Sequence, residues 1–176
     1  IFEKLPNALL ELRTKSIQQE PLAFKSPIEN CVIAYSLLPN KIAEQLDRKA
    51  PSLEKRIDAM ENLAKKGWKI GLRFDPLIYG KEWKILYSDL FEYIFNRINK
   101  DSIHSVTFGS LRFPKEMFKN LFKLNPESKL LSSPFTLRGS KMTYKAEIEL
   151  EMISFCESLI KSYAPEAMSF NCRGDF

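Results

Sequence analysis

Short apolar segments alternate with helical segments along this chain, and this alternation restricts the possible folds more than any other feature. Residues 31–36 form an unbroken apolar run ending in a polar residue, which is typical of a strand buried on both faces of a sheet. Strands that alternate with long amphipathic helices predict an α/β fold with a mainly parallel sheet. The predicted strands cover 8–15, 31–36, 68–77, 103–108 and 168–172, and the predicted helical segments cover 39–46, 53–66, 83–98 and 144–163, with a further helix beginning at Pro114.

The segment after Ser52 carries the clearest helical pattern. Ser52 is a good N-cap, because its side-chain oxygen can accept a hydrogen bond from a backbone N–H of the first turn, and Gly67 suits the position just after the helix. Apolar residues at helical spacing predict one buried stripe, formed by Leu53, Ile57, Met60 and Ala64. The opposite face is expected to be solvated and holds Lys55, Arg56, Asp58 and Glu61.

The sequence also makes definite predictions for three later segments. The pair Asp75 and Pro76 is expected to stop the strand that begins at Trp68. The stretch 125–143 is the least regular part of the chain and is interpreted as a long excursion, which in a compact domain is often functional. The helix that begins at Pro114 is expected to bury one face, made of Met117, Phe118, Leu121 and Phe122.

Composition excludes several classes of protein. The chain has 176 residues, 44% of them hydrophobic, so it can bury the core of one domain. No apolar run approaches the roughly 18 residues of a transmembrane helix, so no membrane partner is expected. Three scattered cysteines argue against a disulfide framework, and a single histidine without any CxxC spacing leaves no metal site in this chain. Cys31, Cys156 and His104 are therefore interpreted as structural.

The charge and the start of the chain leave its context open. The net charge of +5 admits two interpretations, a lysine-rich proteome or an anionic partner. The chain opens at Ile1 without a methionine or a signal peptide. We therefore expect a single fragment, 1–176, of a longer protein located in the cytoplasm.

Polar residues stand at the carboxyl ends of several predicted strands, which is where parallel α/β structures bind ligands. Lys15 suits a carboxylate or phosphate, and Ser36 can donate to the same anion. Asp75 could orient an ammonium or ribose group, or cap the turn. No complete catalytic motif and no glycine-rich phosphate loop occurs, so a cofactor half-site is the most that these residues support. The full set is Thr14, Lys15, Tyr35, Ser36, Asp75, Gly109, Ser110, Arg112, Asn171 and Cys172.

Six motifs in order resemble the C-terminal half of the spore photoproduct lyase family of radical S-adenosylmethionine (SAM) enzymes. Each motif is weak alone, and their order makes the resemblance specific over roughly 8–172. The motifs are ELRTKS (11–16), YSLLP (35–39), APSLEKR (50–56), GWKIGLRFDP (67–76), FGSLRFP (108–114) and SKMTY (140–144).

The resemblance implies a partial (β/α) barrel of radical-SAM type, of which this chain would supply the later strands and helices (8–124) and a C-terminal hairpin, helix and last strand (125–176). The family carries a [4Fe–4S] cluster on a CxxxCxxC loop that would lie upstream of Ile1. The family's SAM-binding lysine and serine fall on Lys15 and Ser36. The strand end at Asp75 would approach SAM through its backbone.

The resemblance also implies a DNA partner. Members reverse a thymine dimer lesion through a 5′-deoxyadenosyl radical, and their DNA-contacting Arg-Tyr pair resembles Thr143 and Tyr144. Tyr144 would be the catalytic tyrosine near the lesion, placed for radical relay. Threonine replaces the family's arginine, and Lys141 or Lys145 would supply the phosphate contact instead.

Other functions remain open at this point. The chain could be a nucleic-acid-binding α/β module without catalysis, a radical SAM homologue acting on another substrate, or a small-molecule-binding α/β domain. As part of a barrel enzyme it would be inactive alone, because it lacks cluster ligands. Apolar surface is then expected where missing strands would pack, with self-association as one consequence.

Overall fold

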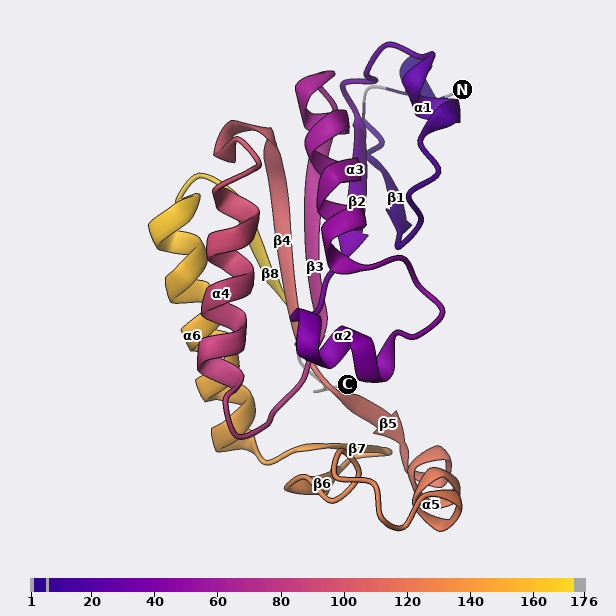
Figure 1. Ribbon diagram of the computed structural model, residues 1–176, viewed down its shortest axis with the longest axis vertical. Helices are drawn as coiled ribbons and strands as arrows, with labels where there is room; N and C mark the ends of the chain where they lie inside the picture. The colour runs from indigo at the N-terminus through magenta and orange to yellow at the C-terminus, as the bar shows by residue number, and fades with distance from the viewer. Residues whose placement is uncertain (1, 6, 173–176) are drawn as a thin grey trace.

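The computed structural model describes residues 2–5 and 7–172, which form two sheets and the helices around them (Figure 1). Residues 1, 6 and 173–176, part of the single unit expected from the sequence, lie outside the described residues. The strands are β1 (Leu10–Thr14), β2 (Cys31–Ser36), β3 (Lys69–Leu77), β4 (Ile103–Ser110), β5 (Arg112–Pro114), β6 (Phe135–Arg138), β7 (Lys141–Tyr144) and β8 (Met168–Asn171). The helices are α1 (Glu20–Ala23), α2 (Asn40–Leu46), α3 (Leu53–Lys65), α4 (Trp83–Phe95), α5 (Lys115–Leu124) and α6 (Ala146–Tyr163), with 3-10 turns η1 (Phe2–Lys4) and η2 (Lys100–Ser102).

The main sheet has five strands in the order β1-β2-β3-β4-β8, and every neighbouring pair is parallel. This arrangement confirms the predicted α/β class and the five predicted strands. Parallel neighbours place their carboxyl ends at one edge of the sheet. In Figure 1 this edge lies at the bottom, next to α2 and the smaller sheet.

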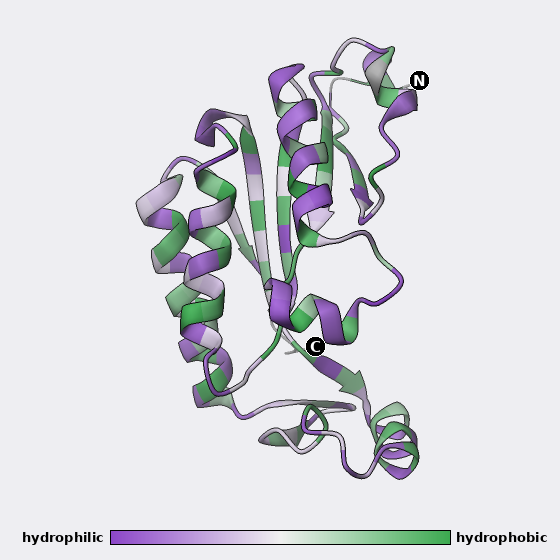
Figure 2. Ribbon diagram, viewed as in Figure 1, coloured by the Kyte–Doolittle hydropathy of each residue, from purple (hydrophilic) through white to green (hydrophobic). Residues whose placement is uncertain are grey.

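The core of the main sheet lies between its strands and helices α3, α4 and α6. Alternate residues of β2, β3 and β4 belong to one buried cluster with the inner faces of these helices. At its centre Phe74 stacks on Phe91, with ring centroids 4.7 Å apart, and on Phe108 at 5.6 Å. Figure 2 shows hydrophobic residues along these strands and a hydrophilic outer surface on α3.

The first turn of α3 forms as the sequence predicts. The Ser52 hydroxyl accepts a hydrogen bond from the backbone N–H of Lys55 at 3.4 Å. Ile57 and Met60 of the predicted stripe are fully buried. Gly67 has a φ of 91°, a left-handed conformation that favours glycine.

The smaller sheet is antiparallel, with the order β5-β7-β6, and its strands β6 and β7 lie at the end of the predicted excursion, apart from Tyr144, which follows it. The expected buried face of the helix after Pro114 is wrong, because the structure records no buried residue in α5. Met117 is 51% exposed and Phe122 is 41% exposed. The smaller sheet has strands of three or four residues, so it offers α5 little apolar area, chiefly through Phe118 against Phe135.

Strand β3 ends at Leu77, which confirms the predicted range 68–77, but Asp75 and Pro76 lie within the strand and do not stop it as expected. A register shift against β4 between Phe74 and Leu77 accommodates the proline, which has no N–H to donate. Tyr144, expected to open the last helix, ends β7 instead.

Both edges of the main sheet expose apolar side chains. Leu12 on β1 is 40% exposed and Phe170 on β8 is 52% exposed. The expected exposed apolar surface is therefore present, and self-association through it stays a prediction. Among the described residues no helix combines the length and apolar character needed to cross a bilayer.

Candidate functional site

The three residues expected to bind the cofactor come from three adjacent strands. Lys15 directly follows β1, Ser36 ends β2 and Asp75 lies near the end of β3. The strands are parallel and pair in register, Thr14 with Tyr35 and Ser36 with Arg73. The fold therefore brings Lys15, Ser36 and Asp75 to the same edge of the main sheet.

Lys15 and Ser36 are linked through two residues outside the strands. The Lys15 ammonium donates to Asp47 Oδ1 at 2.5 Å. Asp47 Oδ2 accepts from Arg56 Nη1 at 3.2 Å, and the same nitrogen donates to the carbonyl oxygen of Ser36 at 2.9 Å. We call Lys15, Asp47, Arg56 and Ser36 the rim network.

The expectation that Arg56 lies on a solvated face is wrong, because its side chain is only 1% exposed. Its position explains the burial, since residue 56 lies three residues after Leu53 and beside Ile57 on the apolar stripe. The guanidinium remains compatible with this interior because Asp47 and the Ser36 carbonyl accept from it. Arg56 Nε is buried without a hydrogen-bond partner among the described residues.

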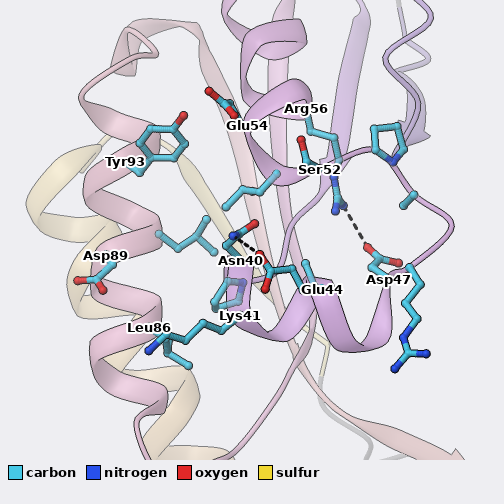
Figure 3. Close-up of a pocket in the computed structure, with 17 residues that line it drawn as sticks. Asn40, Lys41, Glu44, Asp47, Ser52, Glu54, Arg56, Leu86, Asp89 and Tyr93 are labelled. Atoms are coloured by element: carbon cyan, nitrogen blue, oxygen red, sulfur yellow. Dashed lines mark hydrogen bonds and ion pairs between the residues drawn. The ribbon is translucent and has the colours of Figure 1, made fainter.

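Two cavities flank the loop between α2 and α3. A cavity of about 820 Å³ lies between α2, α3 and α4 and includes Arg56 and Tyr93 (Figure 3). A second cavity of about 760 Å³ includes Lys15 and Ser16. Neither of these two cavities includes Ser36 or Asp75. The residues that line both are Asp47, Arg48, Ala50 and Pro51.

Asp75 forms an ion pair with Arg112 rather than with Lys15. The Arg112 guanidinium donates to both carboxylate oxygens of Asp75, at 3.0 and 3.1 Å. Gly109 makes room for this pair, because a Cβ there would lie 2.6 Å from Asp75 Oδ1 and 2.9 Å from Arg112 Nη1. The Asp75 carboxylate is thus engaged, while its backbone remains at the strand end.

Tyr144 lies apart from the rim network, where β7 meets α6. Its ring is fully buried and stacks on Phe135 at 4.7 Å. Its hydroxyl oxygen accepts a hydrogen bond from the backbone N–H of Tyr79 at 3.1 Å. Burial raises the pKa of Tyr144 to about 12, so the phenol stays protonated at neutral pH.

A buried carboxylate joins the smaller sheet to the main sheet at the same place. Glu149 of α6 accepts from the Ser110 hydroxyl and from Arg138 Nη2, both at 2.6 Å. Ser110 ends β4 and also lies 3.3 Å from the Thr143 hydroxyl. Nothing in the sequence pattern marked Glu149 as buried, because it lies in the first turn of α6, where an acidic residue also suits a solvated helix end.

Positive charge gathers in residues 112–145, which we call the basic appendage. It contains eight Lys and Arg residues and two acidic residues, a net charge of +6, whereas the whole chain carries +5. Lys145 is exposed and Lys141 is half-buried. The appendage contains β5, α5, β6 and β7, below the carboxyl edge of the main sheet in Figure 1.

The rim network is chemically suited to the carboxylate end of SAM. Lys15 and Arg56 carry two positive charges against the single negative charge of Asp47, so the network retains a net charge of +1. An iron–sulfur cluster has no comparable site in the part of the chain that the structure describes, which contains no group of three or more His, Cys, Asp or Glu residues able to hold a metal ion.

Comparison with known proteins agrees with the motif resemblance. The family model described as spore photoproduct lyase matches residues 5–169. Spore photoproduct lyase of Bacillus subtilis (strain 168) is 25% identical over 142 residues, which cover 76% of this chain and 42% of the relative. The chain belongs to the spore photoproduct lyase family, within the radical SAM enzymes.

Solved structures of the same family share the fold. A variant of spore photoproduct lyase with bound AdoMet and dinucleoside spore photoproduct has a TM-score of 0.75 and 18% identity, over 93% of this chain and 50% of that one. A second variant with dinucleoside spore photoproduct has a TM-score of 0.79 and 17% identity, over 96% and 52%. The partial-barrel prediction is thereby confirmed. The chain spans about half the length of these relatives.

Proposed function

We propose that this chain is the C-terminal part of a radical SAM lyase that reverses a thymine dimer lesion in DNA. The observation that carries the proposal is the rim network, a cationic group at the carboxyl edge of two adjacent parallel strands in a chain of this family. The sequence expectations for Lys15, Ser36, Asp75, Tyr144, Lys141 and Lys145 become part of this proposal.

In this proposal Lys15 and Ser36 hold the amino-acid end of SAM. The Lys15 ammonium pairs with the SAM carboxylate, and the Ser36 hydroxyl donates to the same group. The backbone of Asp75 lines the adjacent strand end, because its carboxylate is held by Arg112. SAM supplies radical chemistry together with a [4Fe–4S] cluster bound outside this chain, which is why we expect the chain to be inactive alone.

The basic appendage is the proposed contact with DNA. Its charge of +6 suits the phosphodiester backbone, with Lys141 and Lys145 among its cations. Tyr144 lies where the appendage joins the main sheet. Its hydroxyl accepts one hydrogen bond from Tyr79, which leaves the phenolic hydrogen available for the proposed radical relay. A cytoplasmic location is part of the same proposal.

A DNA-binding module without SAM chemistry is the second candidate, and the charge of the appendage favours it. SAM affinity separates the two candidates. We expect Lys15→Ala to weaken SAM binding by roughly tenfold in the complete protein that carries this chain, because a charge-assisted contact is lost. Isothermal titration calorimetry measures this change.

Lys25→Ala is the matched control, since Lys25 is an exposed lysine in the loop between α1 and β2. Its SAM affinity should equal that of the unmodified protein. Unchanged affinity in Lys15→Ala would remove the cofactor assignment. DNA binding without any SAM binding would favour the second candidate.

A further inference from the structure

Asp47 connects the two residues on which the proposed cofactor site depends, although it belongs to neither of their strands. It caps the C-terminal end of α2. One of its carboxylate oxygens accepts from Lys15 and the other accepts from Arg56, as Figure 3 shows for Arg56. Arg56 in turn donates to the carbonyl oxygen of Ser36. The ends of β1 and β2 are therefore joined through one carboxylate and one guanidinium.

The side chains of the rim network differ in how exposed they are, and Lys15 is more exposed than Asp47 or Arg56. Arg56 is 1% exposed and Asp47 is 14% exposed, so both are held by the surrounding fold. Lys15 is 42% exposed. A lysine side chain has four rotatable bonds, and ordering it costs conformational entropy unless a partner already holds it. Asp47 is that partner, and it is itself largely buried and paired with Arg56.

The charge balance leaves Lys15 able to bind a second anion. Arg56 shares the negative charge of Asp47, so the ammonium is not fully neutralised by its partner. A cation held by one carboxylate in such a network can accept another without leaving an unpaired buried charge. Asp47 therefore does not have to release Lys15 before the lysine binds a ligand carboxylate.

We propose that Asp47 is a positioning residue, which, supported by Arg56, holds the Lys15 ammonium beside Ser36 so that it meets the carboxylate of SAM already oriented. The inference rests on the proposed function, because it requires Lys15 to bind SAM. It adds that the affinity of the cofactor site depends on a residue in the loop after α2.

The test compares SAM with 5′-methylthioadenosine, which has the adenosine but lacks the amino-acid end. In the complete protein Asp47→Asn should weaken SAM binding roughly fivefold to tenfold and leave 5′-methylthioadenosine binding unchanged. In a Lys15→Ala background Asp47→Asn should have no further effect, because the positioned group is gone. Asp47→Glu retains the charge and should recover part of the SAM affinity.

Glu44→Gln is the matched control, because this α2 carboxylate contacts Asn40 and not Lys15. It should leave both affinities unchanged. An equal loss for both ligands in Asp47→Asn, tighter SAM binding, or additive effects with Lys15→Ala would each overturn the inference. If Lys15→Ala itself leaves SAM binding unchanged, the proposed cofactor site fails instead.

Discussion

The main sheet and the basic appendage differ in both apolar burial and net charge. The main sheet buries a stack of aromatic rings, with Phe74, Phe91 and Phe108 fully buried. The appendage surrounds Phe118 and Phe135 with short strands and a helix that has no buried residue. The appendage carries a net charge of +6, and the rest of the chain carries −1.

This difference indicates that the two regions of the chain have different roles, one in stability and one in binding. Apolar burial stabilises a fold roughly in proportion to the area removed from water, so the stability of this chain should come from the main sheet. Concentrated positive charge repels itself and adds little to folding, but it attracts polyanions. The appendage should therefore matter for binding more than for stability.

The largest expected effect is the loss of a ring from the aromatic stack. Phe108→Ala should lower the free energy of unfolding by about 3–5 kcal/mol, because it leaves a cavity between β4 and α4. Phe122→Ala, on the exposed α5, should lower it by less than about 1 kcal/mol. Urea denaturation measures both. Comparable losses in the two variants would show that the packing of α5 contributes as much to stability as the core does, and would contradict the proposed difference between the two regions.

The next effect concerns the junction of the two regions. Glu149→Gln should lower the free energy of unfolding by about 1–3 kcal/mol, because Ser110 and Arg138 lose a charged acceptor in a buried site. Amide hydrogen exchange should accelerate in 112–145 and not in β2 and β3. The exposed Glu116, whose partner is Lys119, provides the control: Glu116→Gln should change stability by less than about 0.5 kcal/mol.

The sequence predicts the main sheet well and the appendage poorly, and burial explains both results. Each strand of the main sheet that is buried on both faces reads as an apolar run, as 31–36 does. The appendage strands β5, β6 and β7 have three or four residues and mixed burial, so no periodicity marks them. The amphipathic pattern of α5 predicts a buried face, but the pattern cannot show whether a partner surface exists.

The residues of the candidate site also differ in whether the sequence could predict them. Lys15 and Ser36 could be predicted because strand ends are where parallel sheets bind ligands. Asp47 and Arg56 could not, since their contacts join a loop, a helix and a strand end that are distant in sequence. One signal was present, because the spacing from Leu53 to Arg56 places the arginine on the buried stripe. A charged residue at such a position indicates a buried partner.

A smaller effect is the pH dependence of the main sheet, which contains the only histidine of the chain, His104. Burial lowers its pKa, with the nearby cations Lys69 and Arg73 acting in the same direction and Glu11 opposing them. The folded chain therefore resists protonation, and stability should fall as the pH drops below about 6.5, where the unfolded chain takes up the proton. His104→Gln should flatten this slope in urea denaturation between about pH 7 and pH 5.

The pKa of Glu11 provides an internal control, because hydrogen bonds from Arg73 lower it. Glu11 therefore contributes stability that is lost only at lower pH, as the carboxylate becomes protonated below about 4.3. Glu11→Gln should retain the slope near neutral pH and steepen it slightly, because it removes the charge that opposes the lowering of the His104 pKa. A slope that survives in His104→Gln would assign the pH dependence to other groups.

The smallest effect on stability should come from the lysines of α5, where binding should change instead. Lys115→Ala and Lys123→Ala remove charges from an exposed helix, so each should alter the free energy of unfolding by less than about 0.5 kcal/mol. If either lysine neutralises a DNA phosphate, its loss should reduce the slope of log K against log salt concentration by about 0.9. Fluorescence anisotropy with a DNA oligonucleotide at several salt concentrations measures the slope. Lys66→Ala, at the exposed end of α3 in the main sheet, carries the same charge change and should leave it unaltered. Equal slopes in all three variants would show that the positive charge of the appendage does not face DNA.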